Sequence, residues 1–179
     1  LVDPVVDSVQ GTFLRDGKTL ILPKGGLWDR IEVPYAPPEE YDLTLVVERK
    51  DGSNAFMLGL VSGGRQFAFV LDGWAQGDLG GLDFVDGKGY QENETQIKGR
   101  QLPVGKPATL LCSIRKGGVT VSLEGRKLVE WKGAPSSLSL HPKLAARNPL
   151  VLLLAGWVSR FQISQMTLVP ISGQGQRTR

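Results

Sequence analysis

The sequence contains one cysteine and one histidine in 179 residues, and both shortages exclude classes of protein. A single cysteine cannot form a disulfide within the chain. Zinc sites take three or four Cys, His or acidic ligands, and Cys112 and His141 supply only one of each of the first two types. A catalytic thiol needs a histidine partner, and His141 lies in a predicted loop. Cys112 falls on the apolar face of a predicted strand, where we expect a buried, inert thiol.

Long apolar runs and concentrated charge are also missing. The longest apolar run, Leu150–Ala155, has the length of a strand, well below the roughly 18 residues of a membrane span. No signal peptide is visible. The net charge is +3, and Arg177 and Arg179 at the C-terminus carry two of these charges. Because nucleic-acid binding usually shows as a basic face, we expect no nucleic-acid partner.

Glycine and proline are plentiful, with 23 and 11 residues, and 41% of the chain is hydrophobic. This composition is typical of a globular domain with many strands and turns and a sizeable core. The chain starts at Leu1 without methionine, so we expect it to be a piece of a larger protein. We favour an extracytoplasmic or cell-surface location, while the oligomeric state stays open.

Thr109 to Trp131 carries the strongest structural pattern. Apolar and polar residues alternate through three short segments, which is typical of strands with one buried face. Glycine-containing turns at 116–118 and 124–126 separate these segments and permit tight hairpins. A three-stranded antiparallel meander of this kind needs a second sheet to cover its apolar face.

The same signals predict strands elsewhere in the chain, at Gly11–Arg15, Thr19–Leu22, Trp28–Val33, Tyr41–Arg49, Ala55–Val61, Gln66–Leu71, Leu150–Trp157 and Phe161–Val169. We expect the three strands between Tyr41 and Leu71 to form a second meander and so the second sheet. Leu150–Ala155 is apolar on both faces, as a central strand covered on both sides would be. A bulge is expected near Ser164-Gln165.

The remaining segments carry weaker signals. Residues 72–103 read as irregular, and at most a short helical turn is expected near Pro142–Arg147. The organisation predicted is one β-sandwich domain over residues 1–172, followed by a flexible tail over residues 173–179.

The hairpin GVTVSLEGRKLVEW and the closing pair LLLAGWVSRFQISQMTLVPI resemble the concanavalin A-like lectin/glucanase superfamily. PPEEYDLTLVVER, FVLDGW, VDGKGYQENETQIKG and LLLAGWVSRFQI are similar to a bacterial family of such domains, which are appended to large multidomain proteins. The resemblance covers almost all of residues 5–170. It implies an all-β fold, a two-sheet antiparallel β-sandwich of the concanavalin A-like jelly-roll type. Laminarinases, 3-keto-disaccharide hydrolase-like proteins, lectins and laminin-G-like binding modules are related sandwiches, so the fold alone does not decide the function.

Retaining glucanases of this superfamily place two glutamates and an aspartate on one strand in the pattern E-x-D-x-x-E or a variant one residue longer. The two glutamates must face the same side about 5–5.5 Å apart. The pattern is absent here, since Glu124 and Glu130 flank a hairpin turn. We therefore expect a non-catalytic module that binds a glycan or a protein partner. A hydrolase with an atypical site and a purely structural or assembly domain are the alternatives.

Asp72 to Glu94 combines six acidic residues and one lysine with the aromatic residues Trp74 and Tyr90. Glycan sites pair aromatic faces with carboxylates and amides. The candidate ligand-binding residues are therefore Trp74, Gln76, Asp78, Tyr90, Glu92 and Asn93. Clustered carboxylates with glycine turns are also typical of Ca²⁺ sites. The calcium alternative involves Asp72, Asp78, Asp83 and Asp86, and a purely structural loop is the third reading.

Two of the other three tryptophans fit packing roles. Trp131 and Trp157 end predicted strands in phase with apolar neighbours, so we expect both to pack on the sheets. Trp28 follows Gly25-Gly26, and the pattern assigns it no role.

Overall fold

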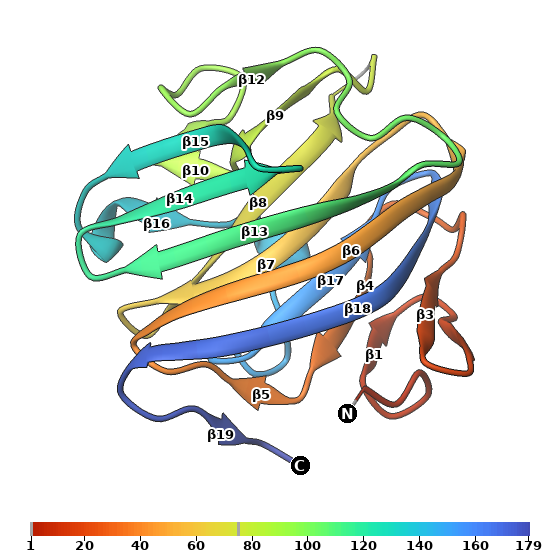
Figure 1. Cartoon of the computed structure of the whole chain (residues 1–179), viewed down its shortest axis with the longest axis horizontal. Coiled ribbons are helices and arrows are strands. Elements are labelled where there is room, and N and C mark those ends of the chain that lie inside the picture. The colour runs from red at the N-terminus through yellow and green to blue at the C-terminus, as the bar shows by residue number, and fades with distance from the viewer. Residues whose placement is uncertain (1, 75) are drawn as a thin grey trace.

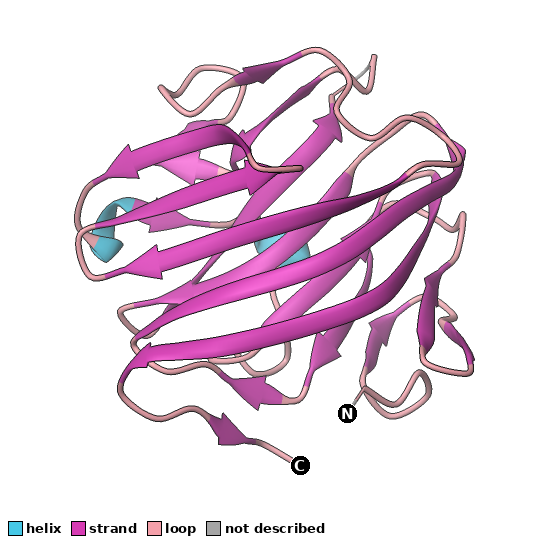
Figure 2. Cartoon of the chain, viewed as in Figure 1, coloured by secondary structure: helices cyan, strands magenta, loops and turns pink. Residues whose placement is uncertain are grey.

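The computed structural model describes residues 2–74 and 76–179; Leu1, in the expected lead-in, and Ala75, in the acidic segment, lie outside the described residues. Two antiparallel seven-stranded sheets pack face to face (Figure 1). Helical structure in the described residues is limited to two 3₁₀ turns, η1 (Pro135–Ser137) and η2 (Pro142–Leu144) (Figure 2). No helix in the described part of the chain is long and apolar enough to cross a membrane. The predicted all-β, two-sheet sandwich is confirmed.

The first sheet, called the β6 sheet, contains the predicted meander as three neighbouring strands. Its strands in spatial order are β15 (Arg126–Lys132), β14 (Gly118–Leu123), β13 (Pro107–Arg115), β6 (Glu40–Gly52), β18 (Ser159–Ser172), β3 (Thr19–Leu22) and β2 (Leu14–Asp16). The turn between β14 and β15 has positive φ at Glu124 (49°) and Gly125 (75°). Two successive positive φ values suit a tight hairpin, so the predicted turn is confirmed.

The second sheet, called the β7 sheet, faces it across the core. Its strands in order are β1 (Ser8–Gln10), β4 (Asp29–Val33), β17 (Leu152–Gly156), β7 (Phe56–Ser62), β8 (Arg65–Gly73), β9 (Leu79–Leu82) and β12 (Ile97–Lys98). The segment expected to be irregular thus contributes β9 and β12 to this sheet. Shorter pairings complete the fold, with β10 (Phe84–Val85) between β11 (Lys88–Gly89) and β16 (Leu138–Ser139), and β5 (Tyr35–Ala36) beside β19 (Gln176–Arg177).

The prediction of a second meander over Tyr41–Leu71 is wrong. β7 and β8 do pair, but β6 lies in the opposite sheet between β13 and β18. The chain crosses from one sheet to the other just after Gly52, which has φ 90°. Alternation shows which side chains are buried, and a strand of either sheet buries one face against the same core. The pattern therefore cannot assign a strand to its sheet.

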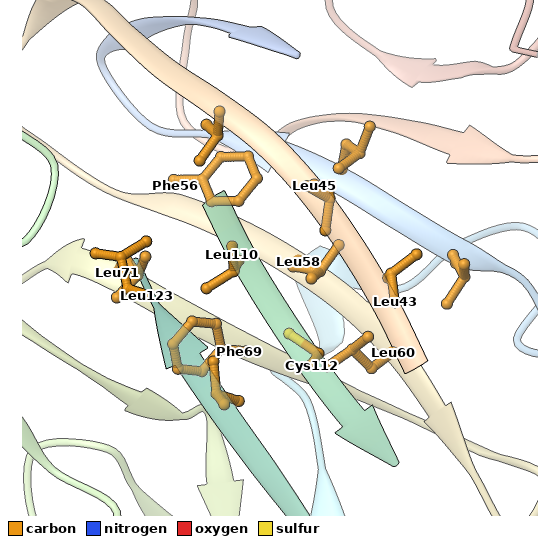
Figure 3. Packing of buried hydrophobic residues seen from close by; sticks show 14 of the residues in the cluster. Leu43, Leu45, Phe56, Leu58, Leu60, Phe69, Leu71, Leu110, Cys112 and Leu123 are labelled. Carbon is orange, nitrogen blue, oxygen red and sulfur yellow. The ribbon is translucent and has the colours of Figure 1, made fainter. Parts of the chain in front are cut away.

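The main core fills the space between the sheets (Figure 3). Leu43 and Leu45 of β6 and Leu110 and Cys112 of β13 are fully buried there. The buried thiol predicted for Cys112 is confirmed, and burial raises its pKa. Each fully buried leucine contributes about 1.5–3 kcal/mol relative to an exposed one, so this layer is the main source of stability.

β17 is covered on both sides, as its sequence predicts. Leu152 and Leu154 face the main core, while Leu153 and Ala155 belong to a second, smaller apolar cluster on the outer face of the β7 sheet. The segment around η2 packs on this outer face through Leu144. The predicted bulge in β18 is also confirmed by the register shift between Ile163 and Gln165.

The C-terminal residues predicted as a flexible tail pair with the rest of the chain. Gln176 and Arg177 form β19 and lie opposite Ala36 and Tyr35 of β5. An ion pair joins the Nη2 atom of Arg179 to the Oδ2 atom of Asp7 at 2.7 Å. These contacts bring the two ends of the chain to the same side of the molecule (Figure 1).

Candidate functional site

Three tryptophans lie across one end of the β7 sheet. Trp28 immediately precedes β4, Trp157 immediately follows β17, and Trp74 immediately follows β8. We call these three residues the tryptophan row. None of the three is fully buried, and Trp74 is 54% exposed.

The strand register places these positions beside one another. Gly156 of β17 lies opposite Asp29 of β4 on one side and opposite Phe56 of β7 on the other. Phe56 in turn lies opposite Leu71 of β8. Four neighbouring strands therefore start or end at the same edge, and residues distant in sequence meet there.

Trp28 is the middle ring of a three-ring stack. Its centroid lies 4.5 Å from that of His141, with the rings 16° apart, and 5.0 Å from that of Trp157. All three side chains are half-buried. Stacked and tilted ring pairs at these distances are favourable beyond the apolar area they bury. The Nε1–H group of Trp157 is buried and, among the described residues, is the one buried side-chain polar atom without a hydrogen-bond partner.

Backbone strain is concentrated at this end of the sheet. Six non-glycine residues of the described chain have positive φ, and four of them are Trp28 (73°), Asp72 (55°), Trp74 (67°) and Val158 (49°). Such conformations are uncommon for bulky side chains and cost on the order of 1–3 kcal/mol each. Strain of this kind persists only where surrounding contacts enforce it, and it is frequent at binding sites.

Contacts around the start of β4 hold Trp28. The Oδ2 atom of Asp29 accepts a hydrogen bond from the Gly26 N–H at 3.0 Å, which closes the loop before the strand. The Nη1 atom of Arg30 donates to the Trp28 carbonyl at 3.1 Å. His141 is fixed through its backbone N–H, which donates to the Oδ2 atom of Asp83 at 2.7 Å. His141, which the sequence places in a loop, is thus a half-buried partner of Trp28.

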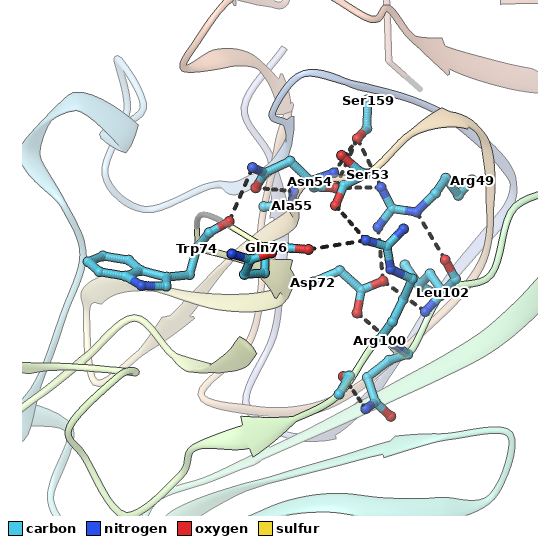
Figure 4. A network of polar contacts seen from close by, with 12 residues as sticks. Arg49, Ser53, Asn54, Ala55, Asp72, Trp74, Gln76, Arg100, Leu102 and Ser159 are labelled. Atoms are coloured by element: carbon cyan, nitrogen blue, oxygen red, sulfur yellow. Dashed lines mark hydrogen bonds and ion pairs between the residues drawn. The ribbon is translucent and has the colours of Figure 1, made fainter. Parts of the chain in front are cut away.

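A buried ion pair supports the other end of the row (Figure 4). The Nη2 atom of Arg49 lies 2.9 Å from the Oδ2 atom of Asp72, and both side chains are fully buried. The Arg49 guanidinium also donates to the carbonyls of Leu102 and Asn54 and to the Ser159 hydroxyl. Burial lowers the pKa of Arg49, and the Asp72 carboxylate opposes that effect.

This network extends to Trp74. The Asn54 amide Nδ2 donates to the Trp74 carbonyl at 3.2 Å, and the Asp72 carboxylate accepts from the backbone N–H groups of Gln101 and Leu102. The Trp74 indole points away from the network (Figure 4). The arrangement fixes the backbone of Trp74 and leaves its ring available to a ligand.

The six predicted ligand-binding residues fall into two groups. Trp74, Gln76 and Glu92 are exposed and Asp78 is half-buried. The Gln76 carbonyl accepts from Arg100 and the Asp78 carbonyl accepts from the Gly99 N–H, so both residues are anchored by their backbones. Gln76 and Asp78 lie on the same short loop as Trp74, between β8 and β9.

Tyr90 and Asn93 form the second group, inside the loop. Tyr90 is 6% exposed, and burial, followed by the charge of Asp83, raises its pKa to about 12. Its hydroxyl lies beneath Gly73, where a Cβ would come within 2.6 Å of it. Asn93 is 4% exposed, and its amide hydrogen-bonds to the carbonyls of Leu82 and Lys88 and to Thr95. These two side chains support the loop from within.

The aspartates considered for calcium do not gather into a site. The Asp72 carboxylate is occupied by Arg49 and two backbone N–H groups, and the Oδ2 atom of Asp83 is occupied by His141. Burial raises the pKa of Asp83, which disfavours the charged form that a cation needs. No three His, Cys, Asp or Glu residues within 2–74 and 76–179 are grouped to hold a metal ion. The described residues therefore do not fit the calcium site that the acidic segment suggested.

Sequence reasoning missed two parts of the site. Arg49 is in phase with the inward-facing residues Tyr41, Leu43 and Leu45 of β6. The alternation of β6 therefore already indicated that the Arg49 charge is buried and must be paired. The association of Trp28, His141 and Trp157 had no such signal, because it depends on strand order. The expected packing of Trp131 is confirmed, with 5% exposure, and Trp157 is half-buried.

The sequence matches no known family model and no curated protein. The fold is similar to solved structures. The carbohydrate-binding module CBM66 from Bacillus subtilis has a TM-score of 0.59 at 14% identity, over 90% of this chain and 92% of that one. The VIP36 exoplasmic/lumenal domain in its Ca²⁺/Man3GlcNAc-bound form has a TM-score of 0.62 at 11% identity, over 97% and 89%.

The alginate lyase AlyC3 has a TM-score of 0.52 at 14% identity, over 84% of this chain and 74% of that one. Identities this low establish the fold alone. The chain has the concanavalin A-like jelly-roll fold that the sequence resemblance implied.

Proposed function

We propose that this protein is a non-catalytic, glycan-binding β-sandwich module whose ligand stacks on the tryptophan row. The observation that carries the proposal is the exposed indole of Trp74, held at positive φ at the same edge of the β7 sheet as two further tryptophans. An exposed, rigid aromatic ring suits the apolar face of a sugar, because little side-chain entropy is lost on binding. Solved structures with the same fold include a carbohydrate-binding module and a lectin domain with bound mannose-type sugar, which supports the proposal.

Polar groups for the sugar hydroxyls lie close to Trp74 in sequence. The Gln76 amide is exposed and the Asp78 carboxylate is half-buried, on the loop anchored by Arg100 and Gly99. Amides and carboxylates orient a ligand through hydrogen bonds, while the stacked ring supplies apolar contact. In this assignment Trp74, Gln76 and Asp78 bind the ligand, with Glu92 at the periphery.

The proposal includes a location outside the cytoplasm or at the cell surface, within a larger bacterial protein. The sequence resemblance to appended bacterial domains supports the larger protein. The likeness to an exoplasmic/lumenal lectin domain supports the location.

The test is a glycan-array screen of the wild type and a Trp74→Ala variant, followed by titration of the best glycan. We expect the variant to bind at least about 30-fold more weakly, since truncating a central aromatic contact typically costs roughly 2 kcal/mol. The matched control is Leu14→Ala, because Leu14 is also exposed (57%) but lies on the edge strand β2 of the other sheet. Equal binding by wild type and Trp74→Ala would overturn the assignment of the site.

The hydrolase alternative is tested with the same glycans. If the protein releases reducing sugar from a polysaccharide panel, and Asp78→Asn or Glu92→Gln abolishes this release, the protein is a hydrolase and the non-catalytic proposal is overturned. A blank array together with no turnover would favour a protein partner or a structural domain.

A further inference from the structure

A cavity of about 410 Å³ opens between the two sheets, on the side of β18 that faces β3 and β5. We call it the edge slot. Its volume falls within the range of about 300–1,000 Å³ that small-molecule pockets occupy. It shares no residue with the tryptophan row, which lies at the opposite ends of β4 and β17.

The slot exists because β18 loses its neighbour along part of its length. β3 pairs with β18 only from Phe161 to Ile163, and the register of β18 against β6 shifts between Ile163 and Gln165. Beyond this bulge Met166 and Leu168 still pack against the main core, but they are only half-buried. The sandwich is therefore open at this edge.

The interior of the slot is apolar. Leu43, Leu152 and Leu154, all nearly or fully buried core residues, line its inner part. Ile163, Met166 and Leu168 of β18 line it from the β6 sheet. A surface of this kind stabilises an aliphatic chain by removing it from water.

Every charged residue that lines the slot is basic. Arg15 comes from β2, Lys18 from the β2–β3 turn, and Arg177 from β19, and all three are exposed. None of them takes part in the ion pairs of the described residues. Hydrogen bonds from the Val6 and Val5 backbone N–H groups lower the pKa of Asp3, and the charges of Arg179 and then Arg15 lower it further. The C-terminal strand β19 thus carries one of the three cations to the slot.

We propose that the edge slot binds a single-chain aliphatic carboxylate, with the alkyl chain between the sheets and the carboxylate at Arg15, Lys18 and Arg177. Apolar walls with cations at the rim match an amphipathic anion and disfavour both a sugar and an amphipathic cation. Guanidinium groups hydrogen-bond a carboxylate in bidentate fashion, so two arginines suit this head group. The proposal does not depend on the glycan site.

The experiment is calorimetric titration of the protein with dodecanoate below its micellar concentration, with dodecanol and dodecyltrimethylammonium as probes of the same chain length. We expect dodecanoate to bind and the other two to bind at least 10-fold more weakly. Decanoate should bind about 16-fold more weakly than dodecanoate, because each buried CH₂ contributes about 0.8 kcal/mol, or about fourfold. Equal binding of all three head groups, or no binding of dodecanoate, would overturn the proposal.

Two variants locate the site. Replacing Arg15, Lys18 and Arg177 together by Gln should weaken dodecanoate binding at least 10-fold. The matched control makes the same replacement by Gln at three exposed lysines outside the slot, Lys88, Lys98 and Lys132, and should leave dodecanoate binding unchanged.

The second variant, Met166→Trp, fills the slot and should abolish dodecanoate binding. Because that variant alters packing, its fold is checked by circular dichroism, and the Gln variant tests the proposal independently of it. Equal loss in the Gln variant and the lysine control would show non-specific attraction and overturn the proposal.

Discussion

The meander β13–β14–β15 and the segment from Asp72 to Leu102 are held in different ways. In the meander, six residues of β13 lie in continuous register with β14, so backbone hydrogen bonds and alternating side chains hold it. In the second segment, single polar side chains replace much of that ladder. Asn93 bonds to Leu82, Lys88 and Thr95, and Asp72 bonds to Arg49, Gln101 and Leu102. A period-two pattern encodes the first region, whereas particular buried polar residues encode the second.

This difference determines where each region is vulnerable. A ladder distributes its stability over many equivalent contacts, so only its inward-facing side chains are sensitive to substitution. A segment held by buried polar groups depends on each of them. When one group is removed by substitution, its former partner stays buried without a hydrogen bond, which lowers stability. The candidate glycan site lies on the second kind of region, beside Trp74.

The largest effect is expected for Asp72→Ala. It leaves the Arg49 guanidinium buried without its counter-charge and removes two backbone hydrogen bonds. We expect the free energy of unfolding to fall by about 3–5 kcal/mol, measured by urea denaturation.

The control for Asp72→Ala is Asp42→Ala. The Asp42–Arg115 ion pair is equally short at 2.8 Å, but its side chains are 30% and 38% exposed. A pair screened by solvent contributes at most about 1 kcal/mol. Similar losses in the two variants would show that burial of the Arg49–Asp72 pair is not what makes the segment sensitive.

A smaller effect is expected in the meander, from Leu110→Ala. Leu110 is fully buried, so the cavity and the lost burial should lower the free energy of unfolding by about 2–4 kcal/mol. Leu111→Ala, one residue away on the opposite face and 37% exposed, should change it by less than about 0.5 kcal/mol. Urea denaturation of both variants measures the difference, and equal losses would contradict the alternation of faces.

No effect is expected from calcium. The acidic residues of the second region are occupied by Arg49 and His141 or lie apart from one another. A ligand that binds only the folded state must raise the melting temperature. Differential scanning calorimetry in excess Ca²⁺ and in chelator should therefore give the same melting temperature, and an increase with Ca²⁺ would reinstate a metal site in the 72–94 loop.

Much of the candidate site was predictable, and the limits have physical causes. The composition of the 72–94 loop drew attention to Trp74 because it combines an aromatic residue with glycines and acids, and the structure leaves the Trp74 ring 54% exposed. Tyr90 and Asn93 have the same composition signal but point inward, and burial depends on the path of the loop in space. The sequence suggested Asp72 as a calcium ligand because its actual partner, Arg49, is distant in sequence and the pairing has no local signal.

The sequence by itself determined the long strands, the inward face of each and the two-layer architecture, because alternation and turn residues act over a few neighbouring positions. The bulge in β18 and the central position of β17 were also local properties. Only the tertiary structure decided that β6 joins the sheet opposite β7. It alone brings Trp28, Trp157 and Trp74 to one edge, and Arg15, Lys18 and Arg177 to another. These arrangements follow from strand order, and strand order is set by packing both sheets on one core rather than by any local sequence preference.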